Sequence, residues 1–325
     1  MAFLEAEGLS KTYVRRLKPA SGGLSRLWRR ETERICALHD VSFSVERGEL
    51  VGILGSNGAG KSTVVKLLTG ILTPTEGTCR VDGRVPWRER REHVRQLGAV
   101  FGQRTQLWWD VPVSDSYALL RDIYRLEPAA WKRRLDELTD ALDLGGFLRT
   151  PLRQLSLGQR MRAELCGSLL HGPALLFLDE PTIGLDAVSK LKLRSFLREE
   201  NAARGTTILL TTHDMEDMLA LCRRVLVLGH GHLLYDGALD TLLRRYDTVH
   251  VLRCAYEGPC DLSGLPEGVD LARDGDGYVL SFAPAEVETG EVLARVLACG
   301  KLREMTLKEQ NVDQLIARMY QEMAL

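Results

Sequence analysis

Long apolar runs are absent from this chain of 325 residues. Its apolar stretches are short and interrupted by charged residues, well below the roughly 18–20 residues that a helix needs to cross a bilayer. The sequence therefore predicts no membrane-spanning helix. The first residues, MAFLEAEGLSKTY, include an early glutamate and lack the apolar stretch of a secretory signal, so we expect no such signal either.

Cysteine pairs with the spacing of a zinc site are also missing. The seven cysteines are irregularly spaced and never form C-x-x-C, which disfavours a disulfide framework or structural zinc and favours reduced cytosolic thiols. An excess of one charge is lacking too, since 43 basic and 44 acidic residues leave a net charge of −1. That balance excludes a polycation that coats nucleic acid. The apolar share of 45% is typical of a globular protein.

Apolar runs alternate with helical patterns over most of the chain. Four runs predict strands that are buried on both faces: Leu50–Leu54, Leu175–Leu178, Ile208–Thr211 and Val225–Leu228. Helical spacing predicts three segments between them: Thr63–Leu72, an insert over 114–149, and Ser189–Ala203. Alternating strands and helices predict an α/β fold with a mainly parallel sheet.

Both ends of the chain depart from this alternation. A short strand within residues 1–13 is followed by a basic segment over 14–34, which we interpret as a loop, either solvated or lying against anionic lipid or an acidic partner. Ala37–Val45 then resumes as a strand. Beyond residue 246, four elements predict a small α+β domain: strands Val249–Cys254 and Tyr278–Phe282, and helices Ala285–Ala298 and Lys308–Met323. The predicted domains are therefore 1–245 and 246–325.

A glycine-rich segment follows the first buried strand directly and fits G-x-x-x-x-G-K-[ST]. Its glycines let the backbone curl so that successive N–H groups point at phosphate oxygens. The lysine can place its charge on the β- and γ-phosphates, and the next hydroxyl can bind Mg²⁺. The pattern predicts nucleotide binding, although kinases, GTPases and motors share it. The predicted contacts are Gly55, Ser56, Asn57, Gly58, Ala59, Gly60, Lys61, Ser62 and Thr63.

An acidic pair ends the strand Leu175–Leu178. Asp179 is placed where a metal bound to phosphates must be held, so we expect it to hold Mg²⁺, through water. Glu180 lies one residue further and can face elsewhere, where it can orient and deprotonate an attacking water. Two adjacent carboxylates with different roles favour hydrolysis over transfer to a bulky acceptor.

The segment Leu155-Ser156-Leu157-Gly158-Gln159-Arg160 lies between the phosphate loop and the acidic pair. Considered locally, Ser156 and Gln159 form a capping box that opens the helix Met161–Leu170. In combination, the three motifs and their order resemble the ATP-binding cassette (ABC) ATPases, over residues 3–240. The segment is similar to that family's signature sequence, except that the family usually has glycine where Leu157 stands.

The resemblance extends to single residues elsewhere. It implies that Tyr13 stacks on adenine and that Gln103 senses Mg²⁺ and the helical insert. It also implies that His213 contacts the γ-phosphate and that Asp186 lies at a dimer interface. Local alternatives stay open: an ordinary half-buried aromatic for Tyr13, a surface polar residue for Gln103, and a helix cap for His213.

The resemblance implies a P-loop NTPase (RecA-like) core with an N-terminal antiparallel β subdomain and a helical subdomain inserted at about 104–165. It implies ATP and Mg²⁺ as cofactors, with Mg²⁺ held by Ser62, Gln103 and Asp179. The implied catalytic residues are Glu180, His213, Lys61 and Gln103. A second copy of the chain would contribute to each site in trans through Ser156, Gly158, Gln159 and Asp186.

The implied function is to power separate membrane permease subunits from the cytoplasmic face of the inner membrane. No nucleic-acid partner is expected. The short C-terminal region and the Leu-Trp-Trp stretch resemble exporters of the daunorubicin-resistance and viologen types, so we expect export. Trp108 and Trp109 are either a permease contact or core residues of the insert. The alternatives are an importer ATPase or a soluble ABC ATPase that acts on nucleic acid or ribosomes.

Overall fold

The computed structural model describes residues 2–16, 32–101, 105–212, 214–246, 250–258, 260–284 and 286–309. These residues belong to two compact units, divided between Gly237 and Ala238, whereas the sequence predicts a division after residue 245. In the described part of the chain, the first unit has two sheets and the second has one, and each unit has its own apolar core.

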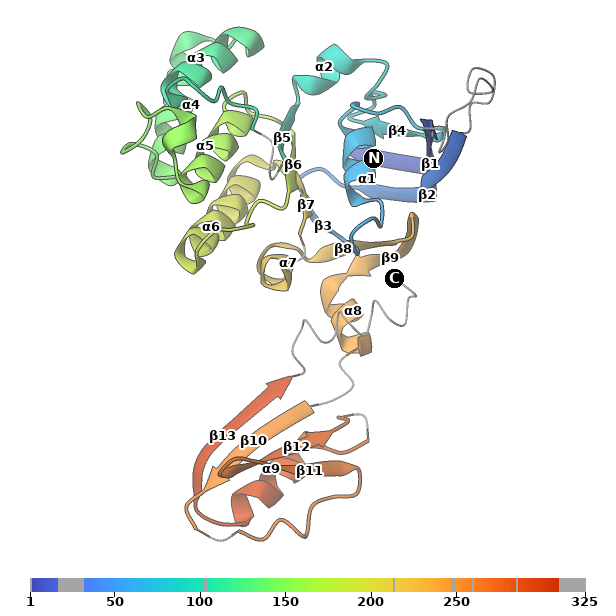
Figure 1. The fold of residues 1–325 in the computed structure, drawn as a ribbon, viewed down its shortest axis with the longest axis vertical. Helices are drawn as coiled ribbons and strands as arrows, with labels where there is room; N and C mark the ends of the chain where they lie inside the picture. The colour runs from blue at the N-terminus through green and yellow to red at the C-terminus, as the bar shows by residue number, and fades with distance from the viewer. Residues whose placement is uncertain are drawn as a thin grey trace, which may run out of the picture. The chain divides into compact units, whose positions relative to one another are not determined.

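The first unit is built around a six-stranded sheet in the order β5-β6-β7-β3-β8-β9 (Figure 1). The pairs β5/β6, β6/β7, β7/β3 and β3/β8 are parallel, which confirms the predicted mainly parallel α/β sheet. Parallel strands end at one edge of a sheet, and here Phe101 lies opposite Asp179, which lies opposite Thr211. The strands are β3 (Leu50–Leu54), β5 (Leu97–Phe101), β6 (Leu175–Asp179), β7 (Thr207–Thr211), β8 (Arg224–Gly229) and β9 (His232–Ala238).

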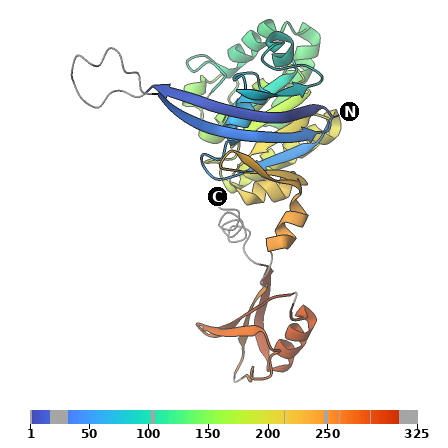
Figure 2. The same ribbon diagram turned by 90° about the vertical axis from the view of Figure 1, so that its right-hand side faces the viewer.

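An antiparallel sheet forms the N-terminal subdomain, as the resemblance implies, in the order β2-β1-β4. Its strands are β1 (Leu4–Arg16), β2 (Thr32–Val45) and β4 (Glu76–Val81), and Figure 2 shows β1 and β2 as a long ribbon across the first unit. Residues 14–16 and 32–34 are strand, so the predicted loop is wrong there. The reason is pairing that composition does not reveal: Arg15 lies opposite Glu33. Residues 17–31 lie outside the described residues.

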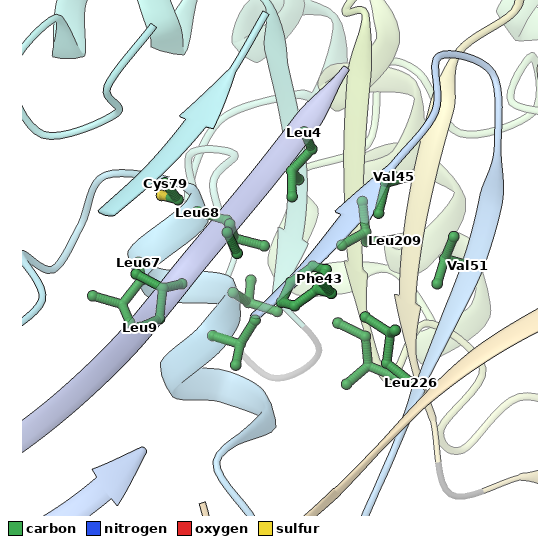
Figure 3. Close-up of a cluster of buried hydrophobic side chains, with 14 of the residues drawn as sticks. Leu4, Leu9, Phe43, Val45, Val51, Leu67, Leu68, Cys79, Leu209 and Leu226 are labelled. Carbon is green, nitrogen blue, oxygen red and sulfur yellow. The ribbon is translucent and has the colours of Figure 1, made fainter. Parts of the chain in front are cut away.

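One apolar core joins the two sheets through helix α1 (Lys61–Leu68). Leu67 and Leu68 of α1 pack in the same cluster as Leu4 and Leu9 of β1, together with Phe43, Val51, Leu209 and Leu226 (Figure 3). Each fully buried leucine contributes about 1.5–3 kcal/mol relative to an exposed one. The helix that begins with the phosphate-loop lysine is therefore anchored from both sheets.

Among the described residues of the first unit, six further helices follow α1. The insert contains α3, α4 and α5, which lie together in Figure 1 and confirm the predicted helical subdomain. Helix α5 begins at Leu157 rather than at Met161, because Ser156 is its N-cap. The helices are α2 (Arg90–Val94), α3 (Val113–Tyr124), α4 (Pro128–Ala141), α5 (Leu157–Leu169), α6 (Ala187–Arg204) and α7 (Met215–Leu221); a 3₁₀ turn covers Leu152–Gln154.

The second unit has an antiparallel sheet in the order β11-β12-β10-β13, which confirms an α+β architecture. Lys308 and Glu309 pair with β10, so the helix predicted to begin at Lys308 is wrong there: the ladder with β10 satisfies their backbone instead. Residues 310–325 lie outside the described residues. The elements are α8 (Leu239–Tyr246), β10 (His250–Tyr256), β11 (Val269–Asp274), β12 (Gly277–Phe282), α9 (Thr289–Ala298) and β13 (Leu302–Glu309).

We expect His171 to make the stability of the first unit depend on pH. Its Nε2 donates to Leu97 O at 3.0 Å, its ring stacks on Tyr124, and its Nδ1 has no hydrogen-bond partner among the described residues. Burial lowers the pKa of His171 from 6.5 to about 4, so the unfolded chain binds this proton more readily. Stability from the neutral ring is therefore complete above pH 6.5 and declines as the pH falls toward 4.

We expect the free energy of unfolding to fall between pH 7.5 and 4.5 by about 2 kcal/mol more in the wild type than in His171→Phe. Phenylalanine can still stack on Tyr124 but does not titrate. Urea titrations at the two pH values measure the difference. The buried His93, whose pKa burial also lowers, is present in both proteins and cancels. An equal fall in both proteins would show that His171 is not the group responsible.

Candidate functional site

The phosphate loop connects β3 to α1. Lys61 Nζ donates to Gly55 O at 2.6 Å and to Ser56 O at 3.1 Å, so its ammonium lies inside the curl of the loop. Gly60 is the N-cap of α1 with a φ of +108°. A Cβ there would come within 2.6 Å of Leu38 Cδ2 and 2.9 Å of Ala37 O. Only glycine fits, which explains the residue type at this position of the motif.

Tyr13 lies beside the start of α1. Its hydroxyl is 3.4 Å from Thr63 Oγ1, and Lys11 Nζ lies 5.7 Å from the centre of its ring. The long strand β1 thus carries an aromatic side chain from the antiparallel sheet to the phosphate loop. The ring is half-buried, and its predicted contact with adenine stays a prediction.

The acidic pair is held at the end of β6 by Thr211. Its Oγ1 donates to Asp179 Oδ1 at 2.5 Å, and its carbonyl accepts from Glu180 N at 2.9 Å. Glu180 has a φ of +55°, a left-handed conformation that costs a residue with a side chain of the order of 1–3 kcal/mol. Such a conformation persists where its surroundings impose it. Thr211 therefore contacts both members of the acidic pair, and no motif in the sequence indicates these contacts.

Lys61 and the acidic pair share one electrostatic environment. Burial lowers the pKa of the Lys61 ammonium, whereas the nearby carboxylates of Glu180 and Asp179 raise it. Two chain segments, the phosphate loop and the end of β6, thereby place one cation and two anions together at the carboxyl edge of the parallel sheet. This arrangement can bind the phosphates of a nucleotide and activate a water beside them.

The signature-like segment forms the N-terminus of α5. Ser156 Oγ accepts from Gln159 N at 3.2 Å and Gln159 Oε1 accepts from Ser156 N at 2.9 Å, so the local capping box is present. In the described part of the chain, the N–H groups of Leu157 and Gly158 have no hydrogen-bond partner. Two free N–H groups at the positive end of a helix dipole can bind an anion.

Leu157, which departs from the family pattern, is accommodated by Gly184. A Cβ at Gly184 would lie 2.4 Å from Leu157 Cδ2, so the missing side chain leaves room for the leucine. The segment around Gly184 leads to Asp186, the N-cap of α6, whose carboxylate accepts from Ser189 N at 2.9 Å and from Ser189 Oγ at 2.8 Å. These hydrogen bonds lower the pKa of Asp186. Its predicted place at a dimer interface stays a prediction.

Gln103 and His213 lie outside the described residues. The described residues beside them fix where the chain enters each segment. Phe101, the last residue of β5, lies opposite Asp179, and Thr212 follows the end of β7. Phe101 and Thr211 therefore lie at the carboxyl edge of the parallel sheet, one on each side of Asp179.

A cluster of ion pairs and hydrogen bonds includes Thr182, two residues after Glu180, and no motif in the sequence indicates it. Arg194 Nε donates to Asp217 Oδ1 at 2.6 Å, and Thr182 Oγ1 donates to Asp217 Oδ2. Lys190 Nζ also donates to Asp214 Oδ2. The only sequence signal is the spacing of Lys190 and Arg194, four residues apart on one face of a helix.

The fold and the site together define a P-loop nucleotide hydrolase. Residues 38–183 match the family model described as ABC transporter. The ABC transporter ATP-binding protein NatA of Bacillus subtilis is 32% identical over 218 residues, 67% of this chain and 88% of NatA. The methionine import ATP-binding protein MetN of Symbiobacterium thermophilum is 36% identical over 233 residues, 69% of this chain and 68% of MetN.

Solved structures of ATP-binding cassettes support the same family assignment. A dimeric post-hydrolysis state of the ATP-binding cassette MJ0796, bound to ADP and phosphate, superposes with a TM-score of 0.61 at 26% identity, covering 73% of this chain and 98% of that one. The chain belongs to the ABC transporter ATP-binding family and is an ATP hydrolase of the ABC type. Among the described residues, no helix combines the length and apolar character that spanning a membrane requires.

Proposed function

We propose that this chain powers membrane permease subunits by an ATP-driven association of two copies, head to tail. The observation that carries the proposal is the α5 N-terminus, whose free N–H groups at Leu157 and Gly158 face no partner in the described chain. Each ATP would lie between the phosphate loop of one copy and Ser156, Gly158, Gln159 and Asp186 of the other. The dimeric state of the MJ0796 relative supports this arrangement.

The residues at the sheet edge suit hydrolysis. Glu180 takes a proton from the water that attacks the γ-phosphorus, and Lys61 neutralises phosphate charge. His213 would steady the γ-phosphate. The oxygen donors of Asp179 and Ser62 fit a hard cation, so these residues and Gln103 would hold Mg²⁺. When bound, that ion would supply further neutralisation of phosphate charge.

The direction of transport that we propose is import. Export is the prediction from the sequence, but the methionine-import relative is more similar in identity, 36%, than NatA, 32%, and no exporter-type name supports the prediction among these relatives. The alternative prediction, an importer ATPase, is therefore the better supported one. Methionine is the first solute to assay.

A basic groove between α2 and the end of α3 suits contact with a permease. Its volume is about 500 Å³, and no arginine that lines it pairs with a carboxylate in the described part of the chain. Ile123, at 61% exposure, adds an apolar wall, while Trp108 and Trp109 are 39% and 46% exposed on the same helical insert. An acidic amphipathic helix would complement this surface, and binding it would hold the chain at the inner face of the membrane. The lining is Arg90, Arg91, Val94, Arg95, Ile123, Tyr124 and Arg125.

Reversing charge in the groove tests this contact. In the double variant Arg91→Glu and Arg95→Glu, we expect recovery of the chain with membranes that contain its permease to fall at least about 10-fold, because like charges replace attraction. The control is Arg198→Glu, an exposed arginine on α6. Basal ATP hydrolysis measures whether the site is intact.

Transport by vesicles that carry the complex then tests the direction. ATP on the side that holds the ATPase should move methionine toward that side. Movement in the opposite direction would restore the export hypothesis. Unchanged membrane recovery of the charge-reversed variant would exclude the groove as the permease contact.

A further inference from the structure

We propose that Asp217 is a positioning residue that holds Glu180 in its catalytic orientation through Thr182. The proposal rests on the proposed function, because it takes Glu180 as the base that activates water. The hydrogen-bond partners of the Asp217 carboxylate in the described part of the chain, Arg194 and Thr182, belong to neither the phosphate loop nor the acidic pair. Asp217 acts through the segments that it joins.

Three segments meet at the Asp217 carboxylate. Its Oδ1 accepts from Arg194 of α6 at 2.6 Å, and its Oδ2 accepts from Thr182, two residues after Glu180. Asp217 belongs to the first turn of α7, which Asp214 caps by accepting from Glu216 N at 3.0 Å. One carboxylate therefore connects the turn after β6 with helices α6 and α7.

Burial strengthens the hydrogen bonds of the Asp217 carboxylate, because it excludes competing water. Asp217 is fully buried, Thr182 is 3% exposed and Arg194 is 7% exposed, so little water competes for the hydrogen bonds. Both oxygens of Asp217 are engaged by donors from different segments. A buried carboxylate with charge-assisted hydrogen bonds fixes its partners more tightly than a solvated pair does.

Glu180 needs such support. Its left-handed backbone, with a φ of +55°, lies between two anchors. On one side, Glu180 N donates to Thr211 O at 2.9 Å. On the other side, Thr182 is tied to Asp217. Without the second anchor the turn can relax toward an unstrained backbone, which would displace the Glu180 carboxylate.

The test compares two substitutions at Thr182 in the full chain. Thr182→Val keeps the shape and removes the hydroxyl, and we expect kcat to fall about 10-fold to 100-fold with KM for ATP nearly unchanged, as for a displaced catalytic group. Thr182→Ser keeps the hydroxyl and should restore kcat. The matched control is Thr207→Val, which removes another buried hydroxyl, bonded to Gly48 N at 2.9 Å, from the amino end of β7.

A double variant separates positioning from general damage. If Thr182 acts through Glu180, adding Thr182→Val to Glu180→Gln should cost little further turnover. Multiplied losses, or a kcat of Thr182→Val equal to the wild type, would overturn the proposal. Near-normal turnover of Glu180→Gln alone would instead remove the general base from the proposed function. Should Thr182→Val fail to fold, Asp217→Asn takes its place, alone and combined with Glu180→Gln. A wild-type kcat of Asp217→Asn, or multiplied losses in the double variant, would again overturn the proposal.

Discussion

Replacing Glu180 with glutamine is expected to lower ATP turnover by at least about 100-fold, and toward roughly 10⁴-fold, while ATP still binds. Glutamine has nearly the same size and can still accept at its oxygen, but it cannot take a proton from water. The backbone contact of residue 180 with Thr211 O does not depend on the side chain. Phosphate release measures turnover, and equilibrium titration with a fluorescent nucleotide measures binding.

Glu199→Gln is the matched control for this substitution. Glu199 is exposed on α6 and accepts from Ser195 Oγ at 2.8 Å, a bond that glutamine can keep. ATP turnover by Glu199→Gln should equal that of the wild type. Glu180→Gln should also accumulate as a dimer under saturating ATP, because hydrolysis no longer removes the nucleotide that joins the copies. Near-normal turnover would take the base role from Glu180, and a monomer in light scattering with permease supplied would contradict the dimer.

The parts of the fold that the sequence predicts well are those with local causes. Buried parallel strands such as β3 and β7 are continuous apolar runs, and the phosphate loop follows β3 without a gap. Polar strands carry no such pattern. In β11, five of six residues are exposed, and its strand conformation depends on pairing with β12. Arg15 and Lys308 also lie in strands because they pair with distant segments, whereas the sequence predicts a loop for the first and a helix for the second.

The candidate site likewise contains residues that a local motif predicts and residues that only distant contacts bring to it. Motifs place Lys61 and the acidic pair, because the chemistry needs those residue types in that order. Their supports come from distant segments: Thr211 is 32 positions from Asp179, and Thr182 is 35 positions from Asp217. The fit of Leu157 against Gly184 is equally non-local. Nothing in a single sequence identifies which buried polar residues will meet.

Replacing Lys61 with methionine is expected to weaken ATP binding about 30-fold or more. Methionine is similarly long and flexible but has no charge, and removing one partner of a desolvated charge pair costs about 2–5 kcal/mol. In the structure the Lys61 ammonium donates to the carbonyls of Gly55 and Ser56. Phosphate oxygens are stronger hydrogen-bond acceptors than carbonyl oxygens, so a bound nucleotide would draw the ammonium away from the two carbonyls. Calorimetric titration with ATP measures the loss.

Lys66→Met is the control for this substitution, because Lys66 lies in the last turn of the same helix, α1. A general effect of removing a lysine from α1 would weaken ATP binding in both variants. Loss of the specific phosphate contact weakens it in Lys61→Met alone. Burial lowers the pKa of Lys61, but the carboxylates of Glu180 and Asp179 oppose that shift, so the acidic pair helps to keep the ammonium charged. Equal affinity of Lys61→Met and the wild type would mean that the backbone N–H groups and the helix dipole hold the phosphates without the lysine.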